Sequence, residues 1–336
     1  MSRTIVWAEP ERAAFVGRVA EAAGLDVVGA GEPGRSGGTS AQRLGVEAAE
    51  DLRAVLSDRA CDVVLVGDAG SFGTTESSGD AEAVLAAMGP GGEGGVRVVC
   101  LEAVPASVFE LTSGGWAKSR HGRRALDGVR FVPSADDHAV LAGMDDVLAS
   151  FGAVRVASVR ALGTAEHAGL GATLLGAVGL MLRVVGSVEV IDAALVTPEA
   201  GHRAGSNEDR LRGLHGHATA IARAESGVVG RVLASDASAA WERTLELIGP
   251  AGRLSVREDG YEWTGLDGAV VDSGQRVIER DPAVASLGGA VRRHLEKPEP
   301  RSEAFVEALT VTQAALLSTR TGQPESPAAI TRATLI

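Results

Sequence analysis

The run DVVLVG at residues 62–67 decides the fold class, because its nearly continuous Val and Leu residues predict a strand buried on both faces. Similar short apolar runs occur at residues 4–7, 25–30 and 96–101, and segments with helical patterns lie between them. Strands of this kind that alternate with helices are typical of a parallel sheet covered by helices. The first third of the chain, residues 1–125, is therefore expected to form a doubly wound α/β domain.

The rest of the chain carries a different pattern. An apolar helix with regularly spaced glycines is expected at residues 170–185, and runs separated by turn signals continue from there to about residue 258. These runs predict an open, mostly antiparallel sheet. The expected architecture is a Rossmann-like parallel sheet, then an α+β domain at residues 126–300, and a C-terminal helix and tail at residues 301–336.

Composition and charge exclude several classes of protein. The 336 residues carry a formal charge of −12, which argues against a nucleic-acid partner because such proteins need a basic face. The most apolar stretch, residues 168–185, is interrupted by glycines and Arg183, so no membrane span is expected. Residues 1–12 lack the apolar core of a signal peptide. Cys61 and Cys100 lie in or beside apolar runs, which favours buried free thiols in a reducing cytoplasm.

The order of these elements resembles the Gfo/Idh/MocA oxidoreductase family. In the first domain, Arg43-Leu44-Gly45-Val46, Asp51-Leu52-Arg53 and the strand that follows match the family pattern. In the second domain, residues 215–252 match the family's sheet strands and its glycine turn. The resemblance covers nearly the whole chain. It implies NAD(P)-dependent hydride transfer on a sugar, a polyol or a related small molecule, and homo-oligomers that pair through the open sheet.

The turn after the first strand departs from the family pattern. In the family this loop is rich in glycine, so that backbone N–H groups at a helix N-terminus can approach the pyrophosphate. Here it has no glycine, and Glu9 and Glu11 would repel an anion. Glu32 follows the second strand, where the family has its ribose-binding acid. By position, the cofactor-binding candidates are Ala8, Glu9, Pro10, Glu32 and Asp68.

The acid–base residues of the family are also missing. The glutamate of its Glu-Lys-Pro motif is matched by Glu102, but no lysine follows, and the whole chain has only Lys118 and Lys297. The helix expected at residues 170–185 contains neither the histidine nor the aspartates of the family's Asp-x-Gly-x-His-x-x-Asp motif. The catalytic candidates that remain are Glu102 and His167.

Four further residues are candidates for a substrate cleft in the second domain. His215 and His217 would share one face of a strand. No third ligand has a suitable spacing, so no metal site is expected. Trp241 and Arg243 combine an aromatic ring with a cation that suits a sugar-like ligand, and packing in the sheet or at a dimer interface is the alternative.

Two functional hypotheses remain open at this point. In the first, the chain is a pseudoenzyme that has lost hydride transfer and acts in small-molecule binding or assembly, as the missing glycines, lysine and helix motif indicate. In the second, it is a divergent but active NAD(P)-dependent oxidoreductase that has relocated its groups to residues such as Glu102, Lys118, His167 or His215.

Overall fold

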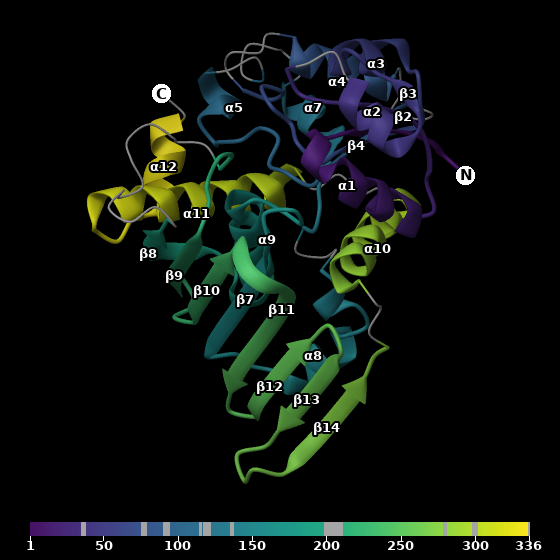
Figure 1. Cartoon of the computed structure of the whole chain (residues 1–336). Helices are drawn as coiled ribbons and strands as arrows, with labels where there is room; N and C mark the ends of the chain where they lie inside the picture. Colours follow the sequence, from purple (N-terminus) through teal and green to yellow (C-terminus); the bar gives the residue numbers. More distant parts are fainter. Residues whose placement is uncertain are drawn as a thin grey trace. The chain divides into compact units, whose positions relative to one another are not determined.

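The computed structural model consists of two compact units, Met1–Pro133 with Val284–Phe305, and Ser134–Ala283 with Val306–Ile336 (Figure 1). It describes residues 1–34, 38–74, 79–89, 95–113, 116, 122–134, 138–197, 211–277, 281–297 and 302–334. Within these residues, no helix is both long and apolar enough to cross a membrane. Cys61 and Cys100 are buried free thiols, as predicted.

The first unit is built on a six-stranded parallel sheet with the order β3-β2-β1-β4-β5-β6. Its strands are β1 (Arg3–Trp7), β2 (Asp26–Gly31), β3 (Glu47–Ala48), β4 (Val63–Val66), β5 (Arg97–Cys100) and β6 (Val129–Phe131). Its helices are α1 (Pro10–Ala22), α2 (Gly38–Leu44), α3 (Leu52–Asp58), α4 (Asp80–Met88), α5 (Glu110–Ser113), α7 (Gly122–Asp127) and most of α10 (Pro282–Glu296). The predicted parallel sheet is therefore confirmed.

The register of the central strands places one edge of this sheet at the candidate site. Trp7 at the end of β1 pairs with Gly31 of β2 and with Val66 of β4, and Val66 pairs with Cys100 of β5. Because parallel strands end at the same edge of a sheet, the residues that follow these strands meet there. All four residues of β4 are fully buried, which explains the apolar run that predicts this strand.

The second unit contains an eight-stranded sheet with the order β14-β13-β12-β11-β7-β10-β9-β8. Neighbouring strands are antiparallel except β7 and β10, which run parallel, so the predicted open and mostly antiparallel sheet is also confirmed. Its strands are β7 (Val156–Thr164), β8 (Val188–Val196), β9 (His217–Ala224), β10 (Val229–Ser235), β11 (Ala237–Gly249), β12 (Gly252–Arg257), β13 (Gly260–Thr264) and β14 (Val270–Gln275). Its helices are η2 (Ala139–Leu141), α8 (Asp145–Phe151), α9 (Leu170–Val185), most of α11 (Ser302–Thr321) and α12 (Pro327–Thr334).

Helix α9 covers one face of this sheet and contacts β7, β9 and β10. Gly230 on β10 permits a close approach, because a Cβ there would lie 2.4 Å from Sδ of Met181 on α9. The last two strands, β13 and β14, were not predicted from the sequence. Most of their residues are exposed or half-buried, so they lack the alternation of buried and exposed residues that indicates a strand.

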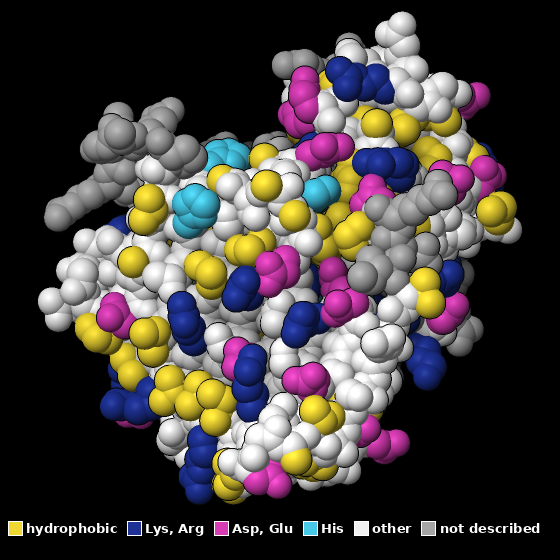
Figure 2. All heavy atoms as spheres, turned by 60° about the horizontal axis from the view of Figure 1, so that its bottom comes forward, with side chains coloured by type: hydrophobic (Ala, Val, Ile, Leu, Met, Phe, Trp, Pro, Cys, Tyr) yellow, Lys and Arg dark blue, Asp and Glu magenta, His cyan; other side chains and the backbone are white. Residues whose placement is uncertain are grey.

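The surface has no concentrated positive charge on the face in Figure 2. Among the described residues there, Lys and Arg side chains (dark blue) are interspersed with acidic (magenta) and hydrophobic (yellow) ones.

Candidate functional site

A buried ionic cluster of Arg12, Asp68 and Glu102 lies at the carboxyl ends of β1, β4 and β5. Nη1 of Arg12 donates to Oδ1 of Asp68 and to the carbonyl of Gly67 (2.8 Å), and it lies 3.7 Å from Oε1 of Glu102. The three side chains are only 10%, 14% and 17% exposed, respectively. Their charges therefore interact in a medium that screens them much less than water does.

The same cluster closes the N-terminus of α1. Oδ2 of Asp68 accepts a hydrogen bond from the backbone N–H of Glu9 (2.9 Å), and Pro10 has no N–H to offer. The N–H groups of Arg12 and Ala13 both donate to the carbonyl of Glu9 (3.0 Å each). A helix N-terminus normally attracts an anion. Here the carboxylate of Asp68 holds that position.

Glu102 is held by the chain's own groups as well. Its Oε2 accepts from the backbone N–H of Ala69 (2.9 Å), while Oε1 faces Arg12. The structure thus brings five predicted residues to one edge of the sheet, and these are Ala8, Glu9, Pro10, Asp68 and Glu102. Arg12, which connects both carboxylates, was not predicted as a site residue. It lies in the first turn of α1, and nothing in its sequence neighbourhood distinguishes it from an exposed helical arginine.

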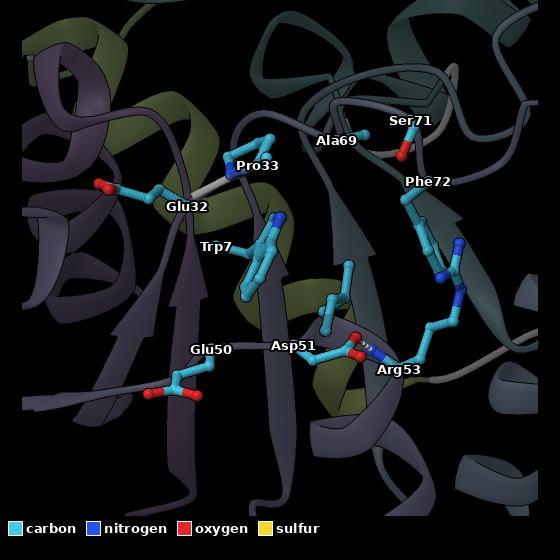
Figure 3. Close-up of a pocket in the computed structure, with 11 residues that line it drawn as sticks. Trp7, Glu32, Pro33, Glu50, Asp51, Arg53, Ala69, Ser71 and Phe72 are labelled. Atoms are coloured by element: carbon cyan, nitrogen blue, oxygen red, sulfur yellow. Dashed lines mark hydrogen bonds between the residues drawn. The ribbon is translucent and has the colours of Figure 1, made fainter. Parts of the chain in front are cut away.

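A cavity of about 420 Å³ opens beside this cluster. Its wall includes Trp7, Pro33, Asp51 and Phe72. Figure 3 shows the indole of Trp7 between the other labelled residues. Glu32 also contributes to the wall, but Figure 3 shows its carboxylate pointing away from Trp7. Two aromatic side chains beside carboxylates suit an uncharged ring with hydroxyl groups better than they suit an anion.

The carboxylates around this cavity are largely used within the protein. Oε2 of Glu32 accepts from the N–H of Ser40 (3.2 Å) and lies 3.0 Å from the Ser40 hydroxyl, and the Glu32 side chain is buried. Oδ1 of Asp51 accepts from the N–H of Arg53 (2.8 Å) and caps α3. Nε of Arg53 in turn donates to Oδ1 of buried Asp80 (2.6 Å). Glu32 therefore supports α2 instead of facing a ligand.

A second group of predicted residues comes together in the second unit. The rings of His167 and Trp241 meet edge to face with centroids 5.6 Å apart, and the guanidinium carbon of Arg243 lies 3.6 Å from the centroid of the Trp241 ring. Nε1 of Trp241 donates to Oε1 of Glu258 (2.8 Å). Glu258 was not predicted, because it follows β12 and reaches Trp241 only through strand pairing.

Arg243 is almost fully buried, with 5% of its surface exposed. Its Nη1 donates to the carbonyls of Leu162 and Glu242. Burial is the largest effect on its pKa and lowers it to about 10, while the carboxylates of Glu258 and Glu242 act in the opposite direction. The guanidinium therefore stays charged at neutral pH.

His215 and His217 do not form the paired strand site that their spacing predicts. Strand β9 begins at His217, and Gly216 has a φ of +111°, so His215 lies outside the strand. Nδ1 of His215 donates to Oδ2 of buried Asp236 (2.9 Å), whereas Nδ1 of His217 lies 2.9 Å from Oγ of Ser235. Among the described residues, no group of three side chains is arranged to hold a metal ion.

Asp236 connects His215 to the start of α9. Besides His215, the Asp236 carboxylate accepts from the N–H groups of Leu170 (3.1 Å) and Gly216 (2.7 Å). Lys297 follows the last residue of α10, and its N–H donates to the carbonyl of Arg293. Lys118 lies outside the described residues.

Solved structures of similar fold cover almost the whole chain. An oxidoreductase from Agrobacterium radiobacter, in complex with NAD+, L-tartaric acid and magnesium, is 13% identical, with 98% of this chain and 99% of that chain covered and a TM-score of 0.65. An oxidoreductase from Pseudomonas syringae is 13% identical, with 97% and 98% covered and a TM-score of 0.68. An inositol dehydrogenase homolog from Azotobacter vinelandii, complexed with NADH and myo-inositol, is 15% identical, with 96% and 97% covered and a TM-score of 0.64.

No family model and no curated protein matches the chain by sequence. The similar structures are oxidoreductases of the Gfo/Idh/MocA type, so the resemblance seen in the sequence is confirmed. At these identities the likeness establishes the fold.

Proposed function

We propose that this chain uses the Gfo/Idh/MocA fold to bind a small molecule and that it does not transfer hydride with a nicotinamide cofactor. The observation that carries the proposal is the Asp68 carboxylate at the N-terminus of α1, where it accepts from the N–H of Glu9 and pairs with Arg12. A pyrophosphate entering here would meet the negative charges of Asp68 and Glu102, and Pro10 would offer it no N–H. The residues of this turn therefore do not fit a dinucleotide.

The missing acid–base groups support the same proposal. Glu102 is the only ionisable residue among residues 101–105, where the family has its lysine, and its carboxylate is held by Ala69 and Arg12. Helix α9 has Arg183 as its only charged residue and contains no histidine. A dehydrogenase needs a group that exchanges a proton with the substrate hydroxyl or carbonyl. Neither segment supplies one.

A second candidate function is that of a divergent, active NAD(P)-dependent oxidoreductase on a sugar, a polyol or a related small molecule. Three observations favour it. The cavity beside Trp7 lies at the edge of the parallel sheet where nucleotide ligands bind in open α/β folds, and similar structures are crystallised with NAD+ or NADH. His215 is also poised for proton transfer, because buried Asp236 fixes its Nδ1 while 62% of the side chain stays exposed.

Assembly of two or more copies through the open sheet belongs to the first proposal. On the sheet face opposite α9, Val229 of β10, Val156 of β7 and Ile248 of β11 stand side by side in register, and Val229 and Ile248 are exposed. Ion pairs such as Arg223–Glu189 (3.1 Å) and Arg253–Glu246 (2.6 Å) lie on the same sheet. An apolar row flanked by charges of both signs suits pairing with a second copy about a two-fold axis.

A turnover assay separates the two candidates. The protein is mixed with each of the four nicotinamide cofactors and a panel of sugars and polyols, and the nicotinamide absorbance is followed. The first proposal predicts no turnover from folded protein. Turnover that is lost in His215→Asn would overturn it and favour the second candidate, since asparagine removes the imidazole and leaves the Asp236 contacts to Leu170 and Gly216 in place.

A further inference from the structure

Arg243 is a buried cation that uses only part of its hydrogen-bonding capacity. Its Nη1 donates to two backbone carbonyls, but within the described residues its Nε and Nη2 have no hydrogen-bond partner and no carboxylate forms an ion pair with it. The two nearest carboxylates are engaged elsewhere, because Glu242 pairs with Arg160 (3.0 Å) and Glu258 accepts from Trp241. Nε and Nη2 both keep some solvent-accessible surface, although Arg243 as a whole is only 5% exposed.

The surrounding residues hold this guanidinium in one orientation. Its flat face rests on the indole of Trp241, 3.6 Å from the ring centroid, and the strand carbonyls fix Nη1. The Nε–Nη2 edge is therefore fixed before any ligand arrives.

A purely structural role accounts poorly for a charge at this position. Along β11, Trp241, Arg243, Leu245 and Leu247 alternate onto the buried face of the sheet, and Arg243 stands opposite fully buried Ala161. A buried cation without a direct counter-ion destabilises a fold, and an apolar side chain of similar size would pack there at lower cost. Because the pKa of Arg243 is about 10, the side chain remains a cation at neutral pH.

We propose that the Nε–Nη2 edge of Arg243 binds the carboxylate of a small organic acid, with Trp241 holding the guanidinium in place. Two parallel N–H donors on a rigid planar group match the two oxygens of a carboxylate. The inference rests on the proposed small-molecule binding and names the chemical class of the ligand. The organic acid supplies the counter-ion that Arg243 lacks among the described residues.

The experiment uses acetate as the smallest carboxylate and acetamide as its uncharged counterpart. The chain has four tryptophans, Trp7, Trp116, Trp241 and Trp263, so a sample labelled with 15N at the indoles gives at most four side-chain signals. Trp241→Phe identifies the Trp241 signal. At constant ionic strength, acetate is expected to shift this signal saturably, with a dissociation constant of about 1–10 mM for one charge-assisted pair. Acetamide is expected to leave it unchanged.

Two variants at Arg243 make the result specific. Arg243→Gln removes the charge and is expected to abolish the acetate response, and the other indole signals report whether it remains folded. Arg243→Lys keeps the charge but loses the paired donors, so acetate should bind about tenfold more weakly. The proposal is overturned if acetate has no effect, if acetamide acts equally, or if the response persists in Arg243→Gln.

Inorganic phosphate is the second arm of the titration. A response to phosphate without one to acetate would overturn the assignment to a carboxylate. Failure of the acetate experiment would leave the proposal about nicotinamide cofactors standing, because that proposal depends on Asp68 in the first unit and is measured by cofactor binding.

Discussion

Arg12→Met tests how much the ionic cluster of Arg12, Asp68 and Glu102 stabilises the first unit. Methionine keeps most of the side-chain length, but it removes the hydrogen bonds to Asp68 and to the Gly67 carbonyl and the ion pair with Glu102. Two nearly buried carboxylates then face each other with no cation between them. Removing one partner of such a pair destabilises a protein by about 3–5 kcal/mol. For a unit of this size, we expect the melting temperature of the first unit to fall by about 10 °C.

The control for this prediction is Asp68→Asn. The asparagine oxygen can still accept from the N–H of Glu9, and Arg12 keeps its contacts with Gly67 and Glu102, so the loss should be about 1–2 kcal/mol. In the double variant the two effects should not add, because the residues are in direct contact. Calorimetric unfolding measures all three. A cost below about 1 kcal/mol for Arg12→Met, or an equal cost for Asp68→Asn, would show that Arg12 is not needed to hold the two carboxylates together.

Three further predictions concern other parts of the chain. Burial raises the pKa of Cys61 from 9.0 to about 11, so the folded state favours the neutral thiol. The free energy of unfolding, measured in urea, should therefore fall by about 2 kcal/mol between pH 9 and 11, and Cys61→Ala should remove this pH dependence. Gly31→Ala would place a Cβ 2.2 Å from the Trp7 ring and 2.4 Å from the Ala49 carbonyl oxygen, so we expect a loss of about 2 kcal/mol in thermal unfolding, and an unchanged melting temperature would contradict the close packing. Ile248→Glu adds a charge to the apolar row of the open sheet. If copies pair through this row as proposed, the variant should sediment as a smaller species than the parent protein, whereas an unchanged sedimentation coefficient would argue against that interface.

The sequence predicts most of the fold because its strongest signals are local. The fully buried β4 is visible as a run of Val and Leu, and α9 begins and ends at the predicted residues, Leu170 and Val185. Strand β3 was missed because it has only two residues, both exposed. Helix α10, which spans Pro282–Glu296, was not predicted from the sequence.

The site is harder to predict because its contacts join residues that are distant in sequence. The absence of glycine after β1 was evident, but Arg12 meets Asp68 only because β1 and β4 are neighbouring parallel strands. Asp236 and Glu258 were missed for the same reason, since they reach His215 and Trp241 through the sheet. The sequence therefore indicates candidate residue types but not the residues that they contact. His215 and His217 were paired with each other and in fact have different partners.

Calorimetric titration of the intact protein with NAD+, NADH, NADP+ and NADPH measures whether the turn after β1 accepts a nicotinamide dinucleotide. Because Asp68 accepts from the N–H of Glu9 and pairs with Arg12, we predict no saturable binding. Any residual dissociation constant should be weaker than about 1 mM, which corresponds to a binding free energy of about −4 kcal/mol. Saturable binding of any of the four at about 10 μM or tighter would overturn the proposed function, since a pyrophosphate would then have displaced the Asp68 carboxylate from α1.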